Sequence, residues 1–378
     1  MRRMRRCPVA LVVLLASSAV VGAQERQFYY PAPAPASFTR LADQRYGDLR
    51  MDVYRPQPGG APAPVLILFN TAAGADRAQP FYQAWAEIAA SKGLVAIMPD
   101  LRMDTLAQDF DALLAHLAAN AASIGGDSDR IAVYAGSGNV FRGLPLFMEP
   151  RRTALKAAVL YYGSADVKAF RRDLPILFVR AGLDRPPVTR AMTDLITLAQ
   201  TQNAPVSVVN YPGGHHAFEM VDDEPATRDV IDTTLDFVAR STSPVYQASL
   251  RRGLPEATAA AHVGGGDFAA ASTIYADLVK AKPDDARLRL SYGEALLGAG
   301  QFAAACSVFD QLKGRGLGPR DLGLPAARAC LQKGDQEAAM AWLASIPARF
   351  LPPAIQSEPV FAPIRERADF KALFAAGR

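Results

Sequence analysis

Hydrophobic residues in the first two thirds of the chain fall into short continuous runs separated by longer amphipathic stretches. Runs rich in β-branched and aromatic residues, typical of buried strands, lie at 64–69, 95–98, 131–134, 157–163, 175–180 and 206–210. Helical periodicity marks the stretches between and after them, at 81–92, 106–122, 187–202 and 226–240. Apolar strands that alternate with helices predict an α/β fold, with a parallel sheet covered by helices on both faces.

The residues before this pattern predict a leader and an opening hairpin. Residues 24–37 form a Pro-rich leader whose alternating prolines favour extended polyproline geometry. Two strand-like pieces follow, near 38–42 and 49–54, and they predict an antiparallel hairpin at the start of the sheet. The α/β domain is therefore expected to span residues 38–240.

A different periodicity begins after Pro244, where the chain becomes alanine-rich and helical. Gly266, Gly300 and Gly334 recur at intervals of 34 residues. The same offset relates three alanines, Ala271, Ala305 and Ala339. A shared period of this length predicts stacked helix pairs that bury a continuous core.

This repeat resembles the tetratricopeptide (TPR) family. It predicts an all-α, TPR-like helical domain over residues 253–378, after a linker at 241–252. Stacked helix pairs commonly hold a peptide or a partner protein on their concave face, so such a partner is one interpretation. No charged or aromatic stripe marks a groove in the sequence, so a simple cap on the first domain is an equal alternative.

The N-terminal residues predict an export signal. Four arginines among the first six residues precede an apolar run at 8–21, and small residues end the segment at Ala23. This is the pattern of a secretory signal peptide at 1–23, and the run is short for a membrane span. The sequence predicts a periplasmic or secreted protein with no span after cleavage, and an uncleaved anchor is the alternative.

Composition and charge argue against some classes of binding partner. The chain has 378 residues, half of them hydrophobic, which is enough for two globular domains. The formal charge of +4 falls to zero when the four arginines leave with the signal. No basic surface then argues for nucleic acid or anionic lipid.

Two cysteines persist after signal cleavage. Cys7 belongs to the signal, whereas Cys306 and Cys330 fall on helices that are expected to pack side by side. An oxidising compartment permits a disulfide between them. Two small buried thiols are the favoured interpretation at this stage.

One predicted strand ends in a sharp turn around a serine. The strand at 131–134 is followed by the sequence Ala-Gly-Ser-Gly-Asn at 135–139. Small residues at this point let a strand turn directly into a helix and expose Ser137 above the sheet, as a nucleophilic serine requires. The usual pattern has glycine at both outer positions, so Asn139 places a polar side chain in a crowded spot.

Two later strands end beside residues that complete such a site. Asp184 lies in the loop after the strand at 175–180, and His216 lies in the loop after 206–210. Ligands of open α/β sheets bind outside the carboxyl ends of the strands, where Ser137 also falls. The order serine, aspartate, histidine is the one expected of α/β-hydrolases.

Several short motifs in the α/β domain resemble those of the dienelactone-hydrolase-like branch of the α/β-hydrolases. They are MPDLR at 98–102, DRI at 129–131, GLD at 182–184 and HAF at 216–218. The resemblance covers a little over half of the chain, residues 38–240. It implies a compact hydrolase without an inserted lid, acting on esters or lactones, with the catalytic histidine at His216.

The triad chemistry assigns a role to each of these residues. Ser137 would attack the substrate carbonyl, His216 would take its proton, and Asp184 would orient the imidazole. The oxyanion would bind the backbone N–H of Gly138 and, as a geometric guess, that of Thr71. No cofactor is expected, and no metal site either, because histidines are few and the cysteines lack ligand spacing.

Each assignment also has a plainer alternative. Asp184 would otherwise cap the following helix, and His216 would be a surface loop residue. The neighbouring His215 is a second candidate for the base, although the phenylalanine two residues after His216 favours His216.

Two hypotheses therefore follow from the sequence. The first is a serine hydrolase that cleaves a small carboxylic ester or lactone. The second is a catalytically inactive hydrolase fold that serves as a TPR-based interaction module. Asn139 and a loop at 70–76 without paired glycines favour the second, and the three triad residue types in the expected order favour the first.

Overall fold

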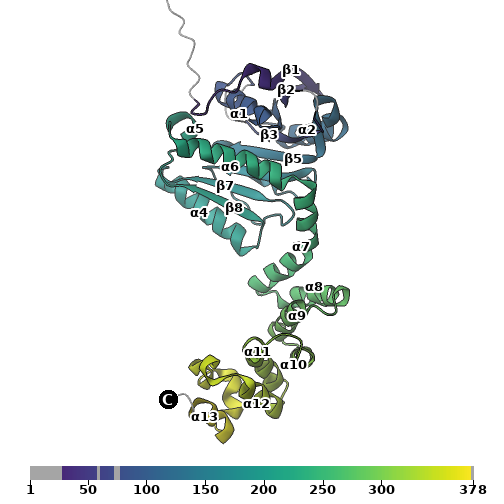
Figure 1. Ribbon diagram of the computed structural model, residues 1–378, viewed down its shortest axis with the longest axis vertical. Coiled ribbons are helices and arrows are strands. Elements are labelled where there is room, and N and C mark those ends of the chain that lie inside the picture. The colour runs from purple at the N-terminus through teal and green to yellow at the C-terminus, as the bar shows by residue number, and fades with distance from the viewer. Residues whose placement is uncertain (1–27, 58–59, 72–76, 376–378) are drawn as a thin grey trace, which may run out of the picture.

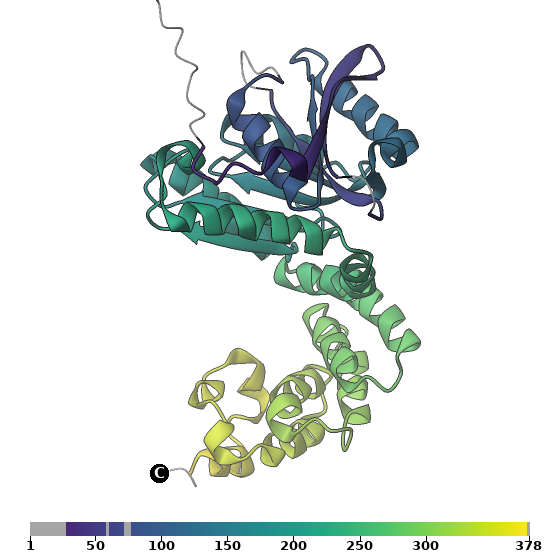
Figure 2. The same cartoon turned by 45° about the horizontal axis from the view of Figure 1, so that its top comes forward.

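The computed structural model describes residues 28–57, 60–71 and 77–375 (Figure 1). The predicted signal peptide at 1–23 lies outside the described residues, and so does the beginning of the predicted leader. An α/β domain is followed by a helical region that extends away from it, as the two views in Figures 1 and 2 show.

Within the described residues, eight strands form one sheet in the order β1-β2-β4-β3-β5-β6-β7-β8. Strand β2 pairs antiparallel with β1 and with β4, and the other neighbouring pairs are parallel. The strands are β1 (Phe38–Tyr46), β2 (Leu49–Pro56), β3 (Ala63–Leu68), β4 (Val95–Pro99), β5 (Gly126–Gly136), β6 (Leu155–Tyr161), β7 (Ile176–Ala181) and β8 (Val206–Tyr211). The predicted hairpin and the α/β-hydrolase sheet are thereby confirmed.

Helices cover both faces of this sheet. They are α1 (Pro80–Ser91), α2 (Leu106–Asn120), α3 (Gly138–Phe147), α4 (Pro186–Thr201), the short α5 (Phe218–Val221) and α6 (Pro225–Ser241). Side chains of α2, α3 and α4 pack in one core, and those of α1, α5 and α6 pack in the other. Successive strand residues point to opposite faces, so Ile67 belongs to the first core and Leu66 to the second.

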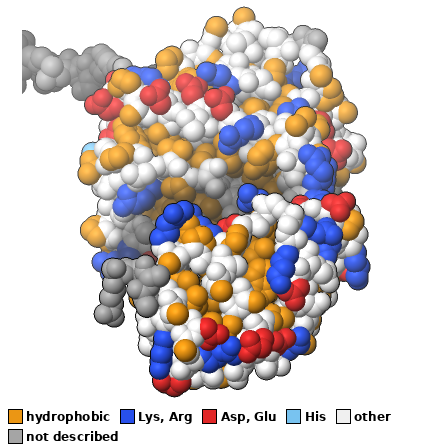
Figure 3. Space-filling view, turned by 60° about the horizontal axis from the view of Figure 1, so that its bottom comes forward, with side chains coloured by type: hydrophobic (Ala, Val, Ile, Leu, Met, Phe, Trp, Pro, Cys, Tyr) orange, Lys and Arg blue, Asp and Glu red, His pale blue; other side chains and the backbone are white. Residues whose placement is uncertain are grey.

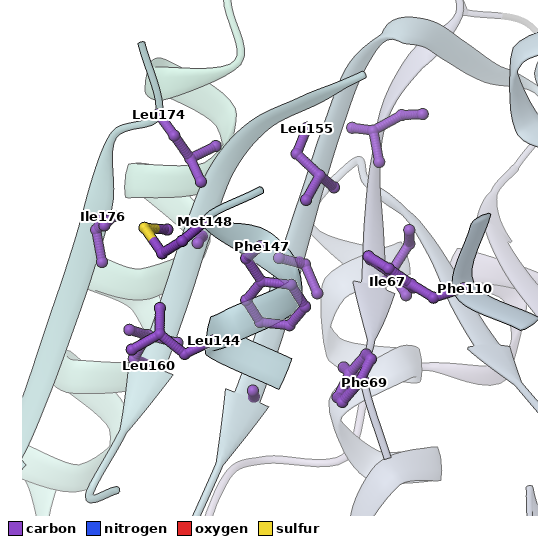
Figure 4. Close-up of a cluster of buried hydrophobic side chains, with 14 of the residues drawn as sticks. Ile67, Phe69, Phe110, Leu144, Phe147, Met148, Leu155, Leu160, Leu174 and Ile176 are labelled. Atoms are coloured by element: carbon purple, nitrogen blue, oxygen red, sulfur yellow. The ribbon is translucent and has the colours of Figure 1, made fainter. Parts of the chain in front are cut away.

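The first core holds the nucleophile helix α3 in place. The rings of Phe69, Phe110 and Phe147 pack against one another, with centroids 5.1 to 5.7 Å apart in the three pairs (Figure 4). Two of the three contacts are edge-to-face, the geometry that aromatic pairs prefer. Phe147 comes from α3 and Phe69 follows β3, so this cluster ties the helix after Ser137 to the middle of the sheet.

The described end of the predicted leader is anchored to the α/β domain. Phe28 is buried against Phe81 and Trp85, with ring centroids 5.6 and 5.9 Å away. The next residue, Tyr29, donates its backbone N–H to the carbonyl of Glu219 on α5 at 2.7 Å. This segment therefore packs against the helix that follows His216.

The C-terminal region is all-helical. Its helices are α7 (Pro244–Gly264), α8 (Phe268–Ala281), α9 (Ala286–Gly298), α10 (Phe302–Gln311), α11 (Pro319–Gln332), α12 (Gln336–Ser345) and α13 (Ala368–Ala375), with short 3-10 turns at Ala348–Phe350, Pro353–Gln356 and Pro359–Ile364. Only Thr242 and Ser243 separate α6 from α7, so most of the segment predicted as a linker at 241–252 is helical. The Gln247 side-chain amide donates to the carbonyls of Lys156 and Ser241, which fixes the start of α7 to the α/β domain.

The 34-residue period has a local structural cause. Gly266, Gly300 and Gly334 lie in the turns between paired helices, with φ of +77°, +74° and +96°. These values lie in the left-handed region that glycine enters without steric cost. The three equivalent alanines are fully buried where the helices pack: Ala271, Ala305 and Ala339.

Cys306 and Cys330 form a disulfide that joins α10 to α11, with their Cα atoms 4.9 Å apart. Both side chains are buried. The structure therefore corrects the favoured interpretation of two free thiols. The sequence could not distinguish free thiols from a disulfide, because a buried thiol and a buried disulfide both fit the same apolar pattern.

The surface of the helical region carries both signs of charge. On the face shown in Figure 3, Lys and Arg side chains are interspersed with Asp and Glu side chains and with hydrophobic ones. Across the described residues, every helix is too short or too polar to traverse a lipid bilayer.

Candidate active site

Ser137 occupies a strained turn between β5 and α3. Its φ of 53° and ψ of −127° are unusual for a residue with a side chain, and such strain persists where the surrounding structure enforces it. The Ser137 N–H donates to the Tyr161 carbonyl at 3.0 Å. A Cβ added at Gly163 would lie 2.5 Å from the Ser137 carbonyl oxygen, so only glycine permits this close approach.

The three residues predicted from separate loops meet in one chain of hydrogen bonds. Ser137 Oγ lies 2.8 Å from His216 Nε2, and His216 Nδ1 lies 2.7 Å from Asp184 Oδ2. The Asp184 carboxyl group is almost fully buried, and its other oxygen accepts the backbone N–H of Arg185 at 2.7 Å. A buried carboxylate with both oxygens engaged is held in a single orientation.

This arrangement selects one tautomer of His216. A carboxylate can only accept, so Nδ1 carries the proton that Asp184 receives. Nε2 is then left with its lone pair facing the Ser137 hydroxyl. This is the state in which an imidazole can act as a general base.

The neighbouring His215 makes a different pair. Its Nδ1 lies 2.7 Å from Asp222 Oδ1, and its backbone N–H donates to the other oxygen of the same carboxylate. The side chain is more than half exposed. The structure therefore brings His216, and not the alternative His215, against Ser137.

A pocket of about 510 Å³ opens beside the triad. Its lining residues are Leu183, Asp184, Arg185, His215, His216, Val221 and Asp222. Leu183 and Val221 are more than half exposed, which gives its mouth an apolar rim. The described residues contain no cluster of three or more His, Cys, Asp or Glu side chains that could hold a metal ion.

Asn139, the departure from the usual serine motif, is fully accommodated. Its Oδ1 accepts the Thr71 N–H at 2.7 Å and the Thr71 hydroxyl at 2.9 Å, and its Nδ2 donates to the Tyr82 hydroxyl at 2.8 Å. All three side chains are buried. Asn139 thus links the start of α3 to α1 and to the segment after β3.

This network bears on the predicted oxyanion hole. The Thr71 N–H is already engaged by Asn139, so Thr71 as an oxyanion donor stays a prediction that requires this bond to break. Most of the rest of that loop, at 72–76, lies outside the described residues. A Cβ added at Gly138 would meet no atom within 4 Å, so this residue borders open space, and its N–H as an oxyanion donor stays a prediction.

Replacing Asn139 with alanine should lower the free energy of unfolding by about 1–3 kcal/mol, because Thr71 would keep a buried N–H and hydroxyl without their acceptor. Urea denaturation followed by circular dichroism measures this change. Tyr82→Phe is the matched control, since it removes only the partner of Nδ2 and should cost less. Equal stability of Asn139→Ala and the wild type would mean that the network contributes nothing.

Two residues near the triad were not anticipated from the sequence. Tyr162 follows β6 with a φ of 33°, and its ring centroid lies 4.7 Å from that of His216. Its hydroxyl donates to the buried carboxyl group of Glu219, three residues after His216. The available signal was a glutamate inside an apolar stretch directly after the histidine motif.

Comparison with known proteins supports a hydrolase. Residues 143–242 match the model of the dienelactone hydrolase family, a segment that contains Asp184 and His216 and begins after Ser137. No curated protein matches the sequence.

Solved structures with a similar fold include several esterases. One, from a study of two fungal esterases of Rhizomucor miehei, is 15% identical, with a TM-score of 0.45 over 54% of this chain and 83% of that chain. A thermostable esterase from Pseudomonas putida is 14% identical, with a TM-score of 0.47 over 56% and 86%. Brefeldin A esterase, described as a bacterial homologue of human hormone-sensitive lipase, is 12% identical, with a TM-score of 0.46 over 58% and 82%. At such identities the likeness concerns the fold alone.

Proposed function

We propose that this chain is a serine hydrolase that cleaves a small carboxylic ester or lactone through Ser137, His216 and Asp184. The observation that carries the proposal is the continuous hydrogen-bond chain between the three side chains. The match of residues 143–242 to the dienelactone hydrolase family supports an ester-bond hydrolase. The pocket of about 510 Å³ is lined by His216 and Asp184 but not by Ser137, so it adjoins the nucleophile, and it has the size of a small-molecule site.

The reaction follows from the geometry in two half-reactions. Ser137 Oγ attacks the ester carbonyl while His216 Nε2 takes its proton, and the tetrahedral oxyanion forms beside the Gly138 N–H. The imidazolium then gives this proton to the leaving alkoxide, and an acyl-serine remains. Water attacks the acyl group with His216 again acting as base, and the acid is released with Ser137 restored.

Export of the protein is part of the proposal. The N-terminal pattern predicts a signal peptide, and the disulfide between Cys306 and Cys330 suits an oxidising compartment. Both support a periplasmic or secreted location. The 34-residue period and its positive-φ glycines support TPR-like repeats, for which a protein or peptide partner is proposed.

The second candidate function is an inactive hydrolase fold that acts through its repeats. The observation that favours it is the bond from Thr71 to Asn139, because that bond occupies a predicted oxyanion donor. The two candidates differ in one property, the nucleophilicity of Ser137.

A fluorophosphonate probe tests this property without knowledge of the true substrate. We expect the folded protein to be labelled covalently, and mass spectrometry of the digested product to place the label on Ser137. Heat-denatured protein should stay unlabelled, because activation depends on His216 being held 2.8 Å away. Absence of labelling in correctly folded protein would reject the hydrolase and favour the interaction module.

A further inference from the structure

Glu219 is a fully buried carboxyl group that the proposed reaction does not use. It lies on α5, three residues after His216, and it has no Lys or Arg ion-pair partner within the described part of the chain. Burying a carboxylate without a cation is costly, so its oxygens must be satisfied by hydrogen bonds. The Tyr162 hydroxyl lies 3.1 and 2.9 Å from the two oxygens, and the Tyr134 hydroxyl lies 3.2 Å from Oε1.

These contacts connect Glu219 to the strand before Ser137 and to the ring that packs against His216. Tyr134 lies on β5, the strand that leads into Ser137. Tyr162 presents its hydroxyl to Glu219 and its ring to the imidazole of His216, 4.7 Å away. The backbone carbonyl of Glu219 is also bound by the Tyr29 N–H, which holds α5 from the other side.

We propose that Glu219 is a positioning residue for His216: acting through Tyr162, its ionised carboxylate holds the imidazole in the orientation that faces Ser137. This inference rests on the proposed function. A hydrogen bond to an ionised acceptor is stronger than one to a neutral acceptor, so the carboxylate form of Glu219 holds the Tyr162 hydroxyl more firmly than the carboxylic acid does.

The surroundings of Glu219 allow its carboxyl group to change protonation state near neutral pH. Burial raises its pKa to about 7, while the hydrogen bonds from Tyr162 and Tyr134 act in the opposite direction. The remaining titratable groups that face it are the buried hydroxyls of Tyr82 and Tyr161, whose pKa values burial raises above the usual range. Glu219 is therefore neutral below this pH and ionised above it.

The test compares Glu219→Gln with the wild type in two measurements across pH 5.5–8.5. The first is the rate of fluorophosphonate labelling at Ser137. We expect the variant to react about tenfold more slowly at pH 8 and to approach the wild type at pH 5.5, because only the ionised carboxylate is lost. The second is the nitrogen chemical shift of His216 in protein labelled at histidine, with His116 as an internal reference. In the wild type it should show an additional step where Glu219 titrates, and that step should vanish in the variant.

Two further variants distinguish a specific effect of the Glu219 carboxylate from a general disturbance of the structure. Tyr162→Phe keeps the ring against His216 but removes its bond to Glu219, so it should also lose the additional step. Tyr161→Phe is the matched control, because its hydroxyl bonds Thr234 and not Glu219, and it should leave both profiles as in the wild type.

The outcomes separate this inference from the proposed function. If Glu219→Gln and Tyr162→Phe both keep the labelling rate and the His216 chemical-shift profile of the wild type, Glu219 has no positioning role. The proposed hydrolase would not be affected by that result. A wild type that is not labelled but shows the coupled titration would reject the hydrolase and still support the link between Glu219 and His216.

Discussion

Replacing Ser137 or His216 with alanine should lower the rate of ester hydrolysis by about 10⁴- to 10⁶-fold, and the double variant should be little worse than either single one. The two side chains act as one unit, since Ser137 is a poor nucleophile until the imidazole 2.8 Å away accepts its proton. Asp184→Asn should cost about 10⁴-fold, because an amide in place of the carboxylate favours the wrong tautomer of His216. Hydrolysis of short-chain 4-nitrophenyl esters measures all four proteins.

His215→Ala is the matched control for this series. It removes the same type of side chain from the same loop, but His215 pairs with Asp222 instead of Ser137. We expect its rate to stay within an order of magnitude of the wild type. A large loss in His215→Ala together with an active His216→Ala would transfer the role of base to His215.

Removing the disulfide should destabilise the helical region by about 3 kcal/mol in a Cys306→Ala, Cys330→Ala double variant. The bridge closes a loop across 24 positions of sequence separation, and in the chain-entropy model a loop of this length costs the unfolded state roughly that much. Thermal and urea unfolding, followed by circular dichroism, should show an earlier transition of the helical region.

Treatment with a reductant separates the bridge from the substitutions. Dithiothreitol should shift the wild type toward the double variant and should leave the double variant itself unchanged. The triad lies in the other domain, so fluorophosphonate labelling should be retained in the double variant. A wild type whose unfolding does not respond to reductant would contradict a stabilising disulfide.

The sheet could be predicted because its strands are buried on both faces. Runs such as 64–69 and 131–134 are apolar at every position, and strand ends then place loop residues at one edge. Asp184 and His216 were found in this way, since their loops follow β7 and β8 and meet the Ser137 turn.

The finer contacts of the site were not predictable, because they depend on residues that are distant in sequence. Asn139 looked like a defect in the serine motif, yet its side chain is satisfied by Thr71 and Tyr82, which lie 68 and 57 positions away. Glu219 could be seen as a polar residue in an apolar stretch, but its partners come from distant parts of the chain: Tyr134 from β5 and Tyr162 from the residue after β6. Hydrogen bonds of this kind leave no periodic pattern.

Helix α7 occupies most of the segment that the sequence predicts as a linker at 241–252. The composition changes after Ser241, Thr242, Ser243 and Pro244, and the last two of these residues start the helix, since Ser243 caps α7 by accepting the Tyr246 N–H. The same residue types favour helix starts as well as loops, so composition alone could not place the break.

The short junction between α6 and α7 restricts how the chain can be divided. Helix α7 is fastened to the α/β domain near its start through Gln247, and Asn203 donates to the Ala257 carbonyl further along. A fragment ending at 240 would lose these contacts, and one beginning at 253 would start in the middle of a helix. An isolated α/β domain and an isolated helical region would therefore each need part of α7, because this helix bonds to the first and belongs to a hydrophobic cluster of the second.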